Sequence, residues 1–479
     1  MGFSLFGLKI FEAGGENVKA PFDISGDLDT PVSAFMKLAA FRPHFLLESV
    51  EGGERLARFS FIGFGEHLAV RLDRGGLIVG EKRTAVPRSG AELLAALRAA
   101  LAAAPQPEPA IPGVPLAGGL VGYAAYDVVR FFERLPARIA GADGVPVLHY
   151  VAPRSLLVFD HLTRSIALVH AGSPEERASL RREIIAALRG GIPHGALRPG
   201  RYATPVAAFS RDQFIGGVKR TQEYIAAGDV YQLVLSMRFA GRHDLDPFQV
   251  YRALRLINPS PYMYYCALGD VTVVGSSPEA LVKLSGTHAQ LRPIAGTRPR
   301  SDDPQVDDQR EADLRADPKE NAEHVMLVDL ARNDLGRVAR AGSVHVDPYR
   351  VIERYSHVMH IVSGVQGELA PGRDAFDLFA ASFPAGTLVG APKVRAMEII
   401  DELEPVGRGL YGGTVGYFGA RGDMDQAITI RTIVFHGDEY SYQAGAGIVA
   451  DSVPASEHEE VLAKSAALVR ALGLAQEGL

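Results

Sequence analysis

Short apolar runs separated by turn-forming residues restrict the fold of this chain more than any other feature. Four such runs have the composition of strands: VTVVGSS (271–277), GGTVGYFGA (412–420), QAITIRTIVF (426–435) and YSYQAGAGIVA (440–450). The spacers GARGDMDQ and HGDEY between them are short and turn-like, which is typical of antiparallel strands. Strands and helices do not alternate strictly, which argues against a doubly wound parallel sheet. The sequence therefore predicts an α+β protein with large, mostly antiparallel β-sheets.

Helical periodicity and breaks divide the chain further. Amphipathic patterns predict helices over residues 90–104, 174–188, 211–227, 318–331, 392–403 and 456–472. The proline-rich stretch PQPEPAIPGVP (105–115) predicts a loop. A longer break rich in Gly, Pro and Arg follows the second helix, and such stretches mark domain boundaries. We therefore predict two domains, residues 1–190 and residues 210–475, joined by a linker over 190–209.

Composition excludes several classes of protein. The 479 residues are 47% hydrophobic and 22% charged with a net charge of -6, so no basic surface suggests a nucleic-acid partner. No apolar run approaches the roughly 20 residues that a membrane helix needs. A single cysteine, Cys266, excludes internal disulfides and sites with several thiolate ligands. We expect a soluble, cytoplasmic protein without a membrane or nucleic-acid partner.

Two predicted helices carry paired carboxylates. Glu457, Glu460 and Lys464 share one face of the last helix, where Ser456 is predicted as the N-cap, and Glu320 and Glu323 lie at i, i+3 on an earlier helix. Two such pairs could hold a hard divalent cation such as Mg²⁺ through oxygen ligands. The same spacing is common on solvated helix faces, so spacing alone favours the surface interpretation.

Other candidates stand in apolar or glycine-rich surroundings. The stretch SFPAGTLVGAPKVRAMEIIDELEP (382–405) places a loop before a helix start, where backbone N–H groups can bind an anion. Arg431 interrupts a predicted strand and needs a carboxylate partner, from the protein or a ligand. His360 lies in a similar run, where a core histidine is the commoner interpretation. These residues indicate an enzyme acting on a small anion, without identifying it.

Long motifs along nearly the whole chain resemble the chorismate-utilising enzymes, and among them the anthranilate synthase large subunits. The motifs include DTPVSAFMKL and FLLESVEGG early in the chain, then PSPYMYY, VGSSPEALVK, RPIAGTRPR, KENAEHVMLVDLARNDLGRV, YSHVMHIVSGV, LYGGTVGYF and QAGAGIVADSVPASEHEE. The resemblance implies two intertwined domains, with antiparallel sheets forming a sandwich-like core and helices outside. It implies regulation within residues 1–190 and catalysis within residues 210–475.

The resemblance also assigns roles to residues. It implies Mg²⁺ held directly or through water by Glu320, Glu323, Glu457 and Glu460. The catalytic residues would be Glu279 as general acid, His360 as base, and Lys464 and Thr387 in the pocket. Chorismate would contact Gly296, Thr297, Tyr411, Arg431, Gly445, Ala446 and Gly447. The expected reaction adds ammonia to chorismate and releases pyruvate and anthranilate.

Two positions discriminate among the relatives. Enzymes that add water to chorismate carry a lysine where this chain has Gln232, which argues against isochorismate and salicylate synthesis. Many aminodeoxychorismate synthases carry a lysine nucleophile where Ala295 stands, so alanine favours direct attack by ammonia. Aminodeoxychorismate or amino-deoxyisochorismate synthase stays as the alternative. A catalytically inactive homologue that senses tryptophan or scaffolds a partner is a third interpretation.

The resemblance implies partners as well. Cys266 lacks the glycine-rich turn of a glutaminase nucleophile, so ammonia is expected from a separate glutamine amidotransferase subunit. The expected assembly is a heterotetramer of two large and two small subunits. Tryptophan is the expected feedback inhibitor, binding at Leu47, Glu48, Ser49, Pro261, Tyr262 and Met263.

Overall fold

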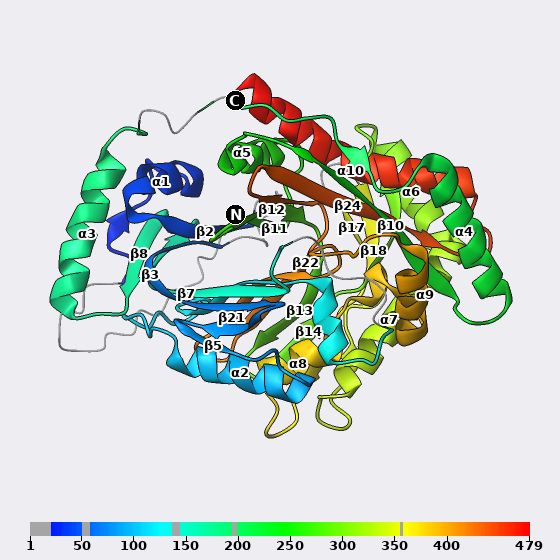
Figure 1. Cartoon of the computed structure of the whole chain (residues 1–479), viewed down its shortest axis with the longest axis horizontal. Coiled ribbons are helices and arrows are strands. Elements are labelled where there is room, and N and C mark those ends of the chain that lie inside the picture. The colour runs from blue at the N-terminus through cyan, green and yellow to red at the C-terminus, as the bar shows by residue number, and fades with distance from the viewer. Residues whose placement is uncertain (1–20, 50–57, 137–143, 194–197, 199, 355–357) are drawn as a thin grey trace, which may run out of the picture.

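The computed structural model describes residues 21–49, 58–136, 144–193, 198, 200–354 and 358–479. Helices surround a large β-sheet core (Figure 1). The helices are α1 (Pro31–Lys37), α2 (Gly90–Ala103), α3 (Pro174–Arg189), α4 (Arg211–Ala226), α5 (Pro247–Ile257), α6 (Pro304–Ala316), α7 (Pro318–Gly336), α8 (Ala375–Ser382), α9 (Lys393–Leu403) and α10 (Pro454–Glu477), with short 3-10 turns η1 (Ala39–Phe41), η2 (Tyr126–Phe131) and η3 (Gly386–Leu388). Among these helices, none combines the length and apolar character needed to cross a bilayer.

One wing of the sheet combines strands from the beginning, middle and end of the chain. Its antiparallel pairings run β2–β11–β12–β23–β24–β10, and β10 also pairs with the short strands β9 and β20. The bounds are β2 (Pro43–Glu48), β9 (Val206–Ala207), β10 (Gln232–Arg242), β11 (Tyr262–Leu268), β12 (Val271–Ser277), β20 (Gly390–Ala391), β23 (Thr432–His436) and β24 (Glu439–Ile448). Helices α5 and α10 lie along this wing (Figure 1).

The second wing continues from the first through two long strands. β3 (Phe59–Asp73) and β7 (Leu148–Asp160) pair along most of their length, with a bulge between Phe64 and His67. On one side of the bulge β3 pairs with β2 of the first wing, and on the other side β7 pairs with β6 of the second wing. From β7 the second wing runs β6–β21–β22–β13–β14–β19–β16, and β4 and then β5 follow β3 at its other end. β8 pairs with the half of β7 that lies in the first wing, and β1 pairs with β8. The bounds are β1 (Ile24–Ser25), β4 (Gly76–Val79), β5 (Lys82–Thr84), β6 (Gly119–Ala124), β8 (Ser165–His170), β13 (Ala280–Ser285), β14 (His288–Leu291), β16 (His345–Val346), β19 (Val365–Glu368), β21 (Thr414–Gly419) and β22 (Met424–Ile428).

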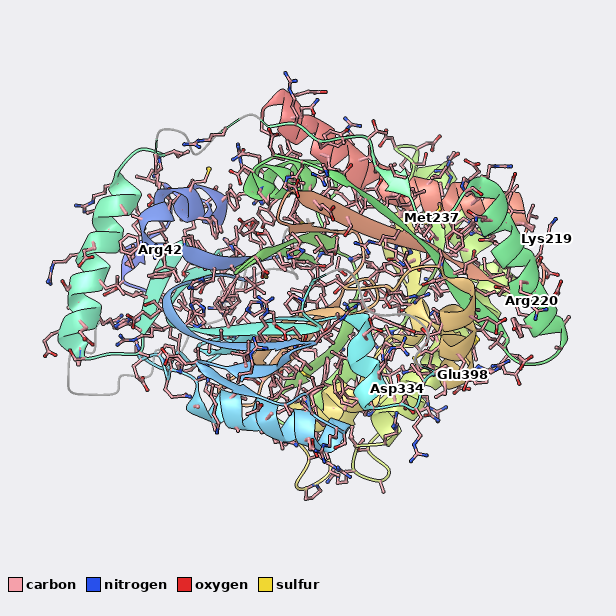
Figure 2. All side chains as sticks on the ribbon, in the orientation of Figure 1. Arg42, Lys219, Arg220, Met237, Asp334 and Glu398 are labelled. Atoms are coloured by element: carbon pink, nitrogen blue, oxygen red, sulfur yellow. The ribbon has the colours of Figure 1, made fainter. Side chains whose placement is uncertain are left out.

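Apolar side chains fill the space between the wings, which explains the sandwich-like arrangement (Figure 2). Residues that face inward from both wings are fully buried, among them Phe45, Tyr123, Tyr264 and Val415. A separate sheet of β15 (Ile294–Pro299), β18 (Val358–Val362) and β17 (Val351–Arg354) lies against α6 and α7. The α+β class, the mostly antiparallel sheets and the outer helices are therefore confirmed.

The predicted elements agree closely with the structure, with two corrections. Ser456 is not the N-cap of α10, because the helix begins at Pro454 with Val453 as its cap, and Pro454 suits the first helical position. The predicted strand over 426–435 is broken between β22 and β23, where Arg431 has a φ of 49°. Arg431 therefore lies at a kink rather than inside a strand.

The division into residues 1–190 and 210–475 stays a prediction, and its linker lies partly outside the described residues. The pairings show how closely the two predicted domains interlock. Strand β2 pairs with β11 in the first wing, and β6 pairs with β21 in the second. Each wing therefore contains strands from both predicted domains.

Candidate active site

A carboxyl group and a hydroxyl group meet at the end of β12. Glu279 lies between β12 and β13, and Thr387 lies in the turn η3 that follows the glycine-rich loop. The Thr387 hydroxyl donates a hydrogen bond of 3.1 Å to Glu279 Oε1, and both residues line one cavity beside α7. Burial raises the pKa of Glu279 to about 7, although the Thr387 hydrogen bond and the charges of Arg431 and Lys464 lower it. At neutral pH this carboxyl group can donate a proton.

His360 lies on β18 and is held by the facing strand β15. Its Nδ1 donates to the carbonyl oxygen of Gly296 at 2.8 Å and lies 3.1 Å from the Thr297 hydroxyl. Because a carbonyl can only accept, the proton is on Nδ1 and Nε2 is the nitrogen that can take another. Burial lowers the pKa of His360, which favours the neutral imidazole that a base requires. The predicted core histidine is therefore half-buried and oriented.

The β15 turn connects His360 to the first carboxylate pair. Gly296 has a φ of 68°, and a Cβ there would lie 3.2 Å from Glu320 Oε2, so only glycine fits without strain. Glu320 also accepts a hydrogen bond of 3.3 Å from Arg298. Burial raises the pKa of Glu320 and the neighbouring charge of Glu323 adds to the rise, while the Arg298 hydrogen bond lowers it. The predicted substrate turn and the predicted metal ligand are thus direct neighbours.

Gln232 lies between Glu323, the second member of that carboxylate pair, and Gly447 on β24. Its Nε2 donates to Glu323 Oε1 at 2.9 Å, and a Cβ on Gly447 would lie 2.8 Å from the same nitrogen. The amide therefore occupies the space between α7 and β24. Gly447 pairs with Val234 on β10, and Ala446 is fully buried in the same strand. Gln232, the position predicted to distinguish the chain from water-adding relatives, therefore lies beside a predicted metal ligand.

The carboxylates of α10 face the same region. Lys464 Nζ donates to the Gly445 carbonyl at 3.0 Å and forms an ion pair of 2.7 Å with Glu460. Burial raises the pKa of Glu457, with the like charge of Glu460 adding to it and the charges of Lys319 and Lys464 opposing it. Lys319 lies in the first turn of α7, and Glu457 lies in the first turn of α10.

Tyr411 completes the arrangement on the β24 side. A Cβ on Gly445 would lie 2.6 Å from the Tyr411 hydroxyl, so only glycine at position 445 leaves room for the Tyr411 side chain. Arg431 and Glu279 are near enough for their charges to interact. The predicted catalytic, substrate and carboxylate residues thus form a continuous series of neighbours around one region, although their individual roles stay predictions.

The four carboxylates predicted to bind metal are oxygen ligands of the type that Mg²⁺ prefers. All four predicted ligands are glutamates, and the pKa values of Glu320 and Glu457 are raised by burial first and then by the charge of the neighbouring carboxylate. Among the described residues, no three His, Cys, Asp or Glu side chains are clustered as a complete protein cage. Mg²⁺ commonly uses only one or two carboxylates with waters and a substrate oxygen. The residues therefore fit a metal site that a substrate anion would complete.

The residues predicted to bind tryptophan also come together. Met263 pairs directly with Glu48, and Tyr264 pairs with Leu47, across neighbouring strands β11 and β2. Tyr262 begins β11 directly after Pro261, Ser49 directly follows β2, and Tyr262 donates to Asp425 at 3.0 Å. The buried carboxylate of Glu48 is held by Tyr251 and by Arg255 at 3.2 Å. Glu48 is thus already paired within the protein.

A buried ion pair behind Tyr411 escaped the sequence analysis. Arg408 and Glu404 are both 4% exposed and are joined by hydrogen bonds of 2.7 and 3.0 Å. Arg408 also donates to the carbonyls of Leu388 and Val234, and its guanidinium lies 5.5 Å from the centre of the Tyr411 ring. It therefore links the loop that carries Thr387, strand β10 and Tyr411. The i, i+4 spacing of an acid and a base after α9 was the available signal.

The fold and this set of residues define a class of chorismate enzyme. A family model described as chorismate binding enzyme matches residues 42–470. The chain therefore belongs to the chorismate binding enzyme family.

Within that family, the chain is similar to proteins named anthranilate synthase component 1. One from Thermus thermophilus is 47% identical, with 95% of this chain and 97% of the relative covered. Another from Pseudomonas aeruginosa is 43% identical, with 98% and 99% covered. The crystal structure of anthranilate synthase component I from Streptococcus pneumoniae TIGR4 has a TM-score of 0.77 and 33% identity, covering 95% of this chain and all of that one.

Proposed function

We propose that this chain converts chorismate and ammonia to anthranilate, pyruvate and water, as the chorismate subunit of an anthranilate synthase. The observation that carries the proposal is the similarity to proteins named anthranilate synthase component 1 along nearly the whole chain. The presence of an acid that titrates near neutrality, Glu279, and of an oriented base, His360, supports it. The same relatives disfavour aminodeoxychorismate and amino-deoxyisochorismate synthesis, and Ala295 lacks the amine that a covalent route would need.

Glu279 acts in the first step. Ammonia attacks C2 of the chorismate ring, the double bonds shift, and the C4–oxygen bond breaks. Glu279 gives its proton to the departing 4-hydroxyl, which leaves as water, and the added nitrogen loses a proton to solvent. A pKa of about 7 keeps this carboxyl about half protonated at neutral pH and largely protonated below it, which suits a general acid. The Thr387 hydrogen bond positions the carboxyl oxygen.

His360 acts in the second step. Its Nε2 takes the proton from C2, the C3–oxygen bond breaks, and the ring becomes aromatic. The released enolpyruvyl group gains a proton from solvent and becomes pyruvate. The Nδ1–H bond to Gly296 holds the imidazole in the tautomer that this proton transfer requires. Tyr411, Arg431 and the backbone at Gly447 would hold the enolpyruvyl carboxylate. The two steps classify the proposed enzyme as a carbon–oxygen lyase.

Mg²⁺ belongs to the proposal because of the paired glutamates. Glu320, Glu323, Glu457 and Glu460 would hold the ion directly or through water, and the ion would neutralise charge and orient the ring carboxylate. Lys464 limits the negative charge around α10 through its pair with Glu460.

Anthranilate fluorescence tests the whole proposal. The purified chain is incubated with chorismate, Mg²⁺ and ammonium at mildly alkaline pH, and the chain itself contains no tryptophan to obscure the signal. We expect fluorescence that disappears with chelator and returns with excess Mg²⁺. A non-fluorescent amino product that retains the pyruvyl group would assign the chain to a sister activity. Signal that survives complete chelation would contradict the metal proposal alone.

A glutaminase partner and tryptophan feedback complete the proposal. The word component in the relatives' names supports a second subunit, and we propose a glutamine amidotransferase in a heterotetramer, in the cytoplasm. Tryptophan would bind where β2 and β11 pair. Glutamine should support anthranilate formation only after the partner is added, as measured by the same fluorescence. Tryptophan that neither lowers the rate nor gives a heat of binding would contradict the feedback proposal.

A further inference from the structure

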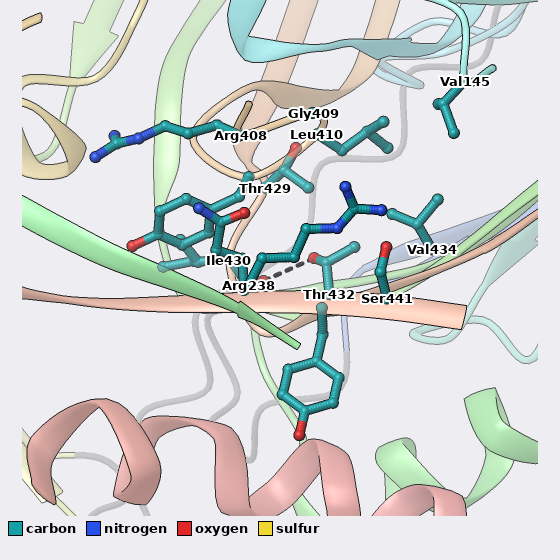
Figure 3. A pocket seen from close by; sticks show the side chains of 13 residues that line it. Val145, Arg238, Arg408, Gly409, Leu410, Thr429, Ile430, Thr432, Val434 and Ser441 are labelled. Atoms are coloured by element: carbon teal, nitrogen blue, oxygen red, sulfur yellow. Dashed lines mark hydrogen bonds between the residues drawn. The ribbon is translucent and has the colours of Figure 1, made fainter. Parts of the chain in front are cut away.

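A pocket beside the predicted substrate site contains an arginine that no described residue neutralises. The pocket lies among β10, β23, β24 and the turn at residues 408–411, and encloses about 450 Å³ of empty space including its open mouth. Among the described residues that line it, none is Asp or Glu. The half-buried Arg238 extends through the pocket toward Val434 and Ser441 (Figure 3). Among the residues that the structure describes, its guanidinium makes no ion pair or hydrogen bond.

Two buried oxygens in the same pocket also lack partners. Thr429 Oγ1 and Gln443 Oε1 have no hydrogen-bond partner among the described residues, and the two residues are 1% and 6% exposed. Gln443 donates its Nε2 to Ser236 Oγ at 2.8 Å, which fixes the amide and leaves Oε1 as the unsatisfied atom. Unpaired buried polar atoms are costly, so this pocket is built for a polar occupant. A free guanidinium makes that occupant an anion, and a planar carboxylate matches its paired donors.

The pocket borders the substrate site at one end. Tyr411 lines the pocket and contacts Gly445, and Ile430 in the pocket wall precedes Arg431 in the chain. Gln443 and Gly445 are two residues apart on β24 and therefore face the same side of the sheet. Tyr411 and Arg431 are among the residues proposed to meet the enolpyruvyl carboxylate. A small carboxylate released there would lie close to the pocket that Tyr411 and Arg238 both line.

We propose that the Arg238 pocket is a second binding site, for a small monocarboxylate, and that pyruvate occupies it during turnover. The inference rests on the proposed function for the identity of the carboxylate, but not for the existence of the site. The carboxylate would accept hydrogen bonds from Arg238 and from the Thr429 hydroxyl, while a water or an enol hydroxyl would donate to Gln443. No bond is made or broken in this binding.

Binding of pyruvate to the full chain without chorismate tests the site directly. Isothermal titration calorimetry compares the native chain with Arg238→Gln and with Arg242→Gln, a control on the same strand whose arginine is 74% exposed and paired with Asp438. We expect Arg238→Gln to weaken pyruvate binding at least about tenfold, as loss of hydrogen bonds to a charged group does, and Arg242→Gln to change nothing. Equal binding by all three chains, or none by the native chain, would overturn the proposal.

Two further arms locate and identify the ligand. Arg431→Gln should retain pyruvate binding. If pyruvate binding is instead lost in Arg431→Gln and retained in Arg238→Gln, pyruvate binds in the substrate site and the proposal is overturned. Chloride at equal concentration should not displace pyruvate, and displacement would mean a general anion site. In the fluorescence assay, pyruvate should inhibit non-competitively with chorismate, and Arg238→Gln should relieve this inhibition. Because calorimetry needs no turnover, failure of the proposed function leaves this test intact.

Discussion

At the scale of single residues, His360 gives the sharpest prediction about chemistry. Replacing it with alanine removes the only proposed base for the C2 proton, so we expect pyruvate release to fall by about 10²–10⁴-fold. Chorismate binding should stay nearly intact, because the carboxylate contacts are elsewhere. The measurement is the initial rate of pyruvate formation beside a chorismate titration. His345→Ala, at an exposed position of β16, is the control, and unchanged turnover in His360→Ala would remove His360 from the mechanism.

The hydrogen bond between Thr387 and Glu279 predicts a shift in pH dependence. A general acid works while protonated, so kcat/KM should fall as pH rises through the Glu279 pKa of about 7. The Thr387 hydrogen bond lowers that pKa, and Thr387→Val should therefore move the alkaline limb to higher pH. Thr387→Ser keeps the hydroxyl and should keep the limb in place. The rates must be measured at constant free ammonia, and an identical limb in all three chains would exclude Glu279 as its source.

At the scale of elements, the Arg408–Glu404 pair predicts a large effect on stability. Removing one partner leaves a buried charge unpaired, so Arg408→Met should lower the free energy of unfolding by about 3–5 kcal/mol. Adding Glu404→Leu to the same chain should recover some of the loss, because both charges are then absent. Urea unfolding measures both variants. Arg242→Met, which breaks an exposed pair on β10, should have little effect.

The sequence predicted elements better than it predicted their junctions. The helix pattern at 211–227 and the strand VTVVGSS reappear as α4 and β12, because local periodicity reflects which face is buried. The kink at Arg431 was missed, since its φ depends on neighbours that are distant in sequence. Resemblance, rather than periodicity, located Glu279 and His360, because nothing local makes a carboxyl titrate near 7. The sequence also does not predict that the Arg238 guanidinium has no partner among the described residues, because this depends on which side chains the fold places near it.

At the scale of the whole molecule, the shared strands predict the behaviour of fragments. A chain of residues 210–479 would lose β2 from β11 and β6 from β21, leaving two strand edges with unpaired backbone groups. We expect it to aggregate, and to become soluble when produced together with residues 1–209. Size-exclusion chromatography and circular dichroism measure the outcome. A monomeric, folded fragment 210–479 would instead show that the boundary at 190–209 separates independent domains.

The pairing of β6 with β21 also determines how long β6 lacks its partner strand while the chain is being synthesised. Residues 119–124 leave the ribosome about 300 residues before residues 414–419, their partners in the second wing. At roughly 5–20 residues per second, β6 waits on the order of 15–60 s with one edge open. During that interval its six buried residues are exposed to any molecule that binds extended apolar chain. We therefore expect newly made copies to need protection of this edge until residues 414–419 are made, whereas in the finished protein β21 covers it.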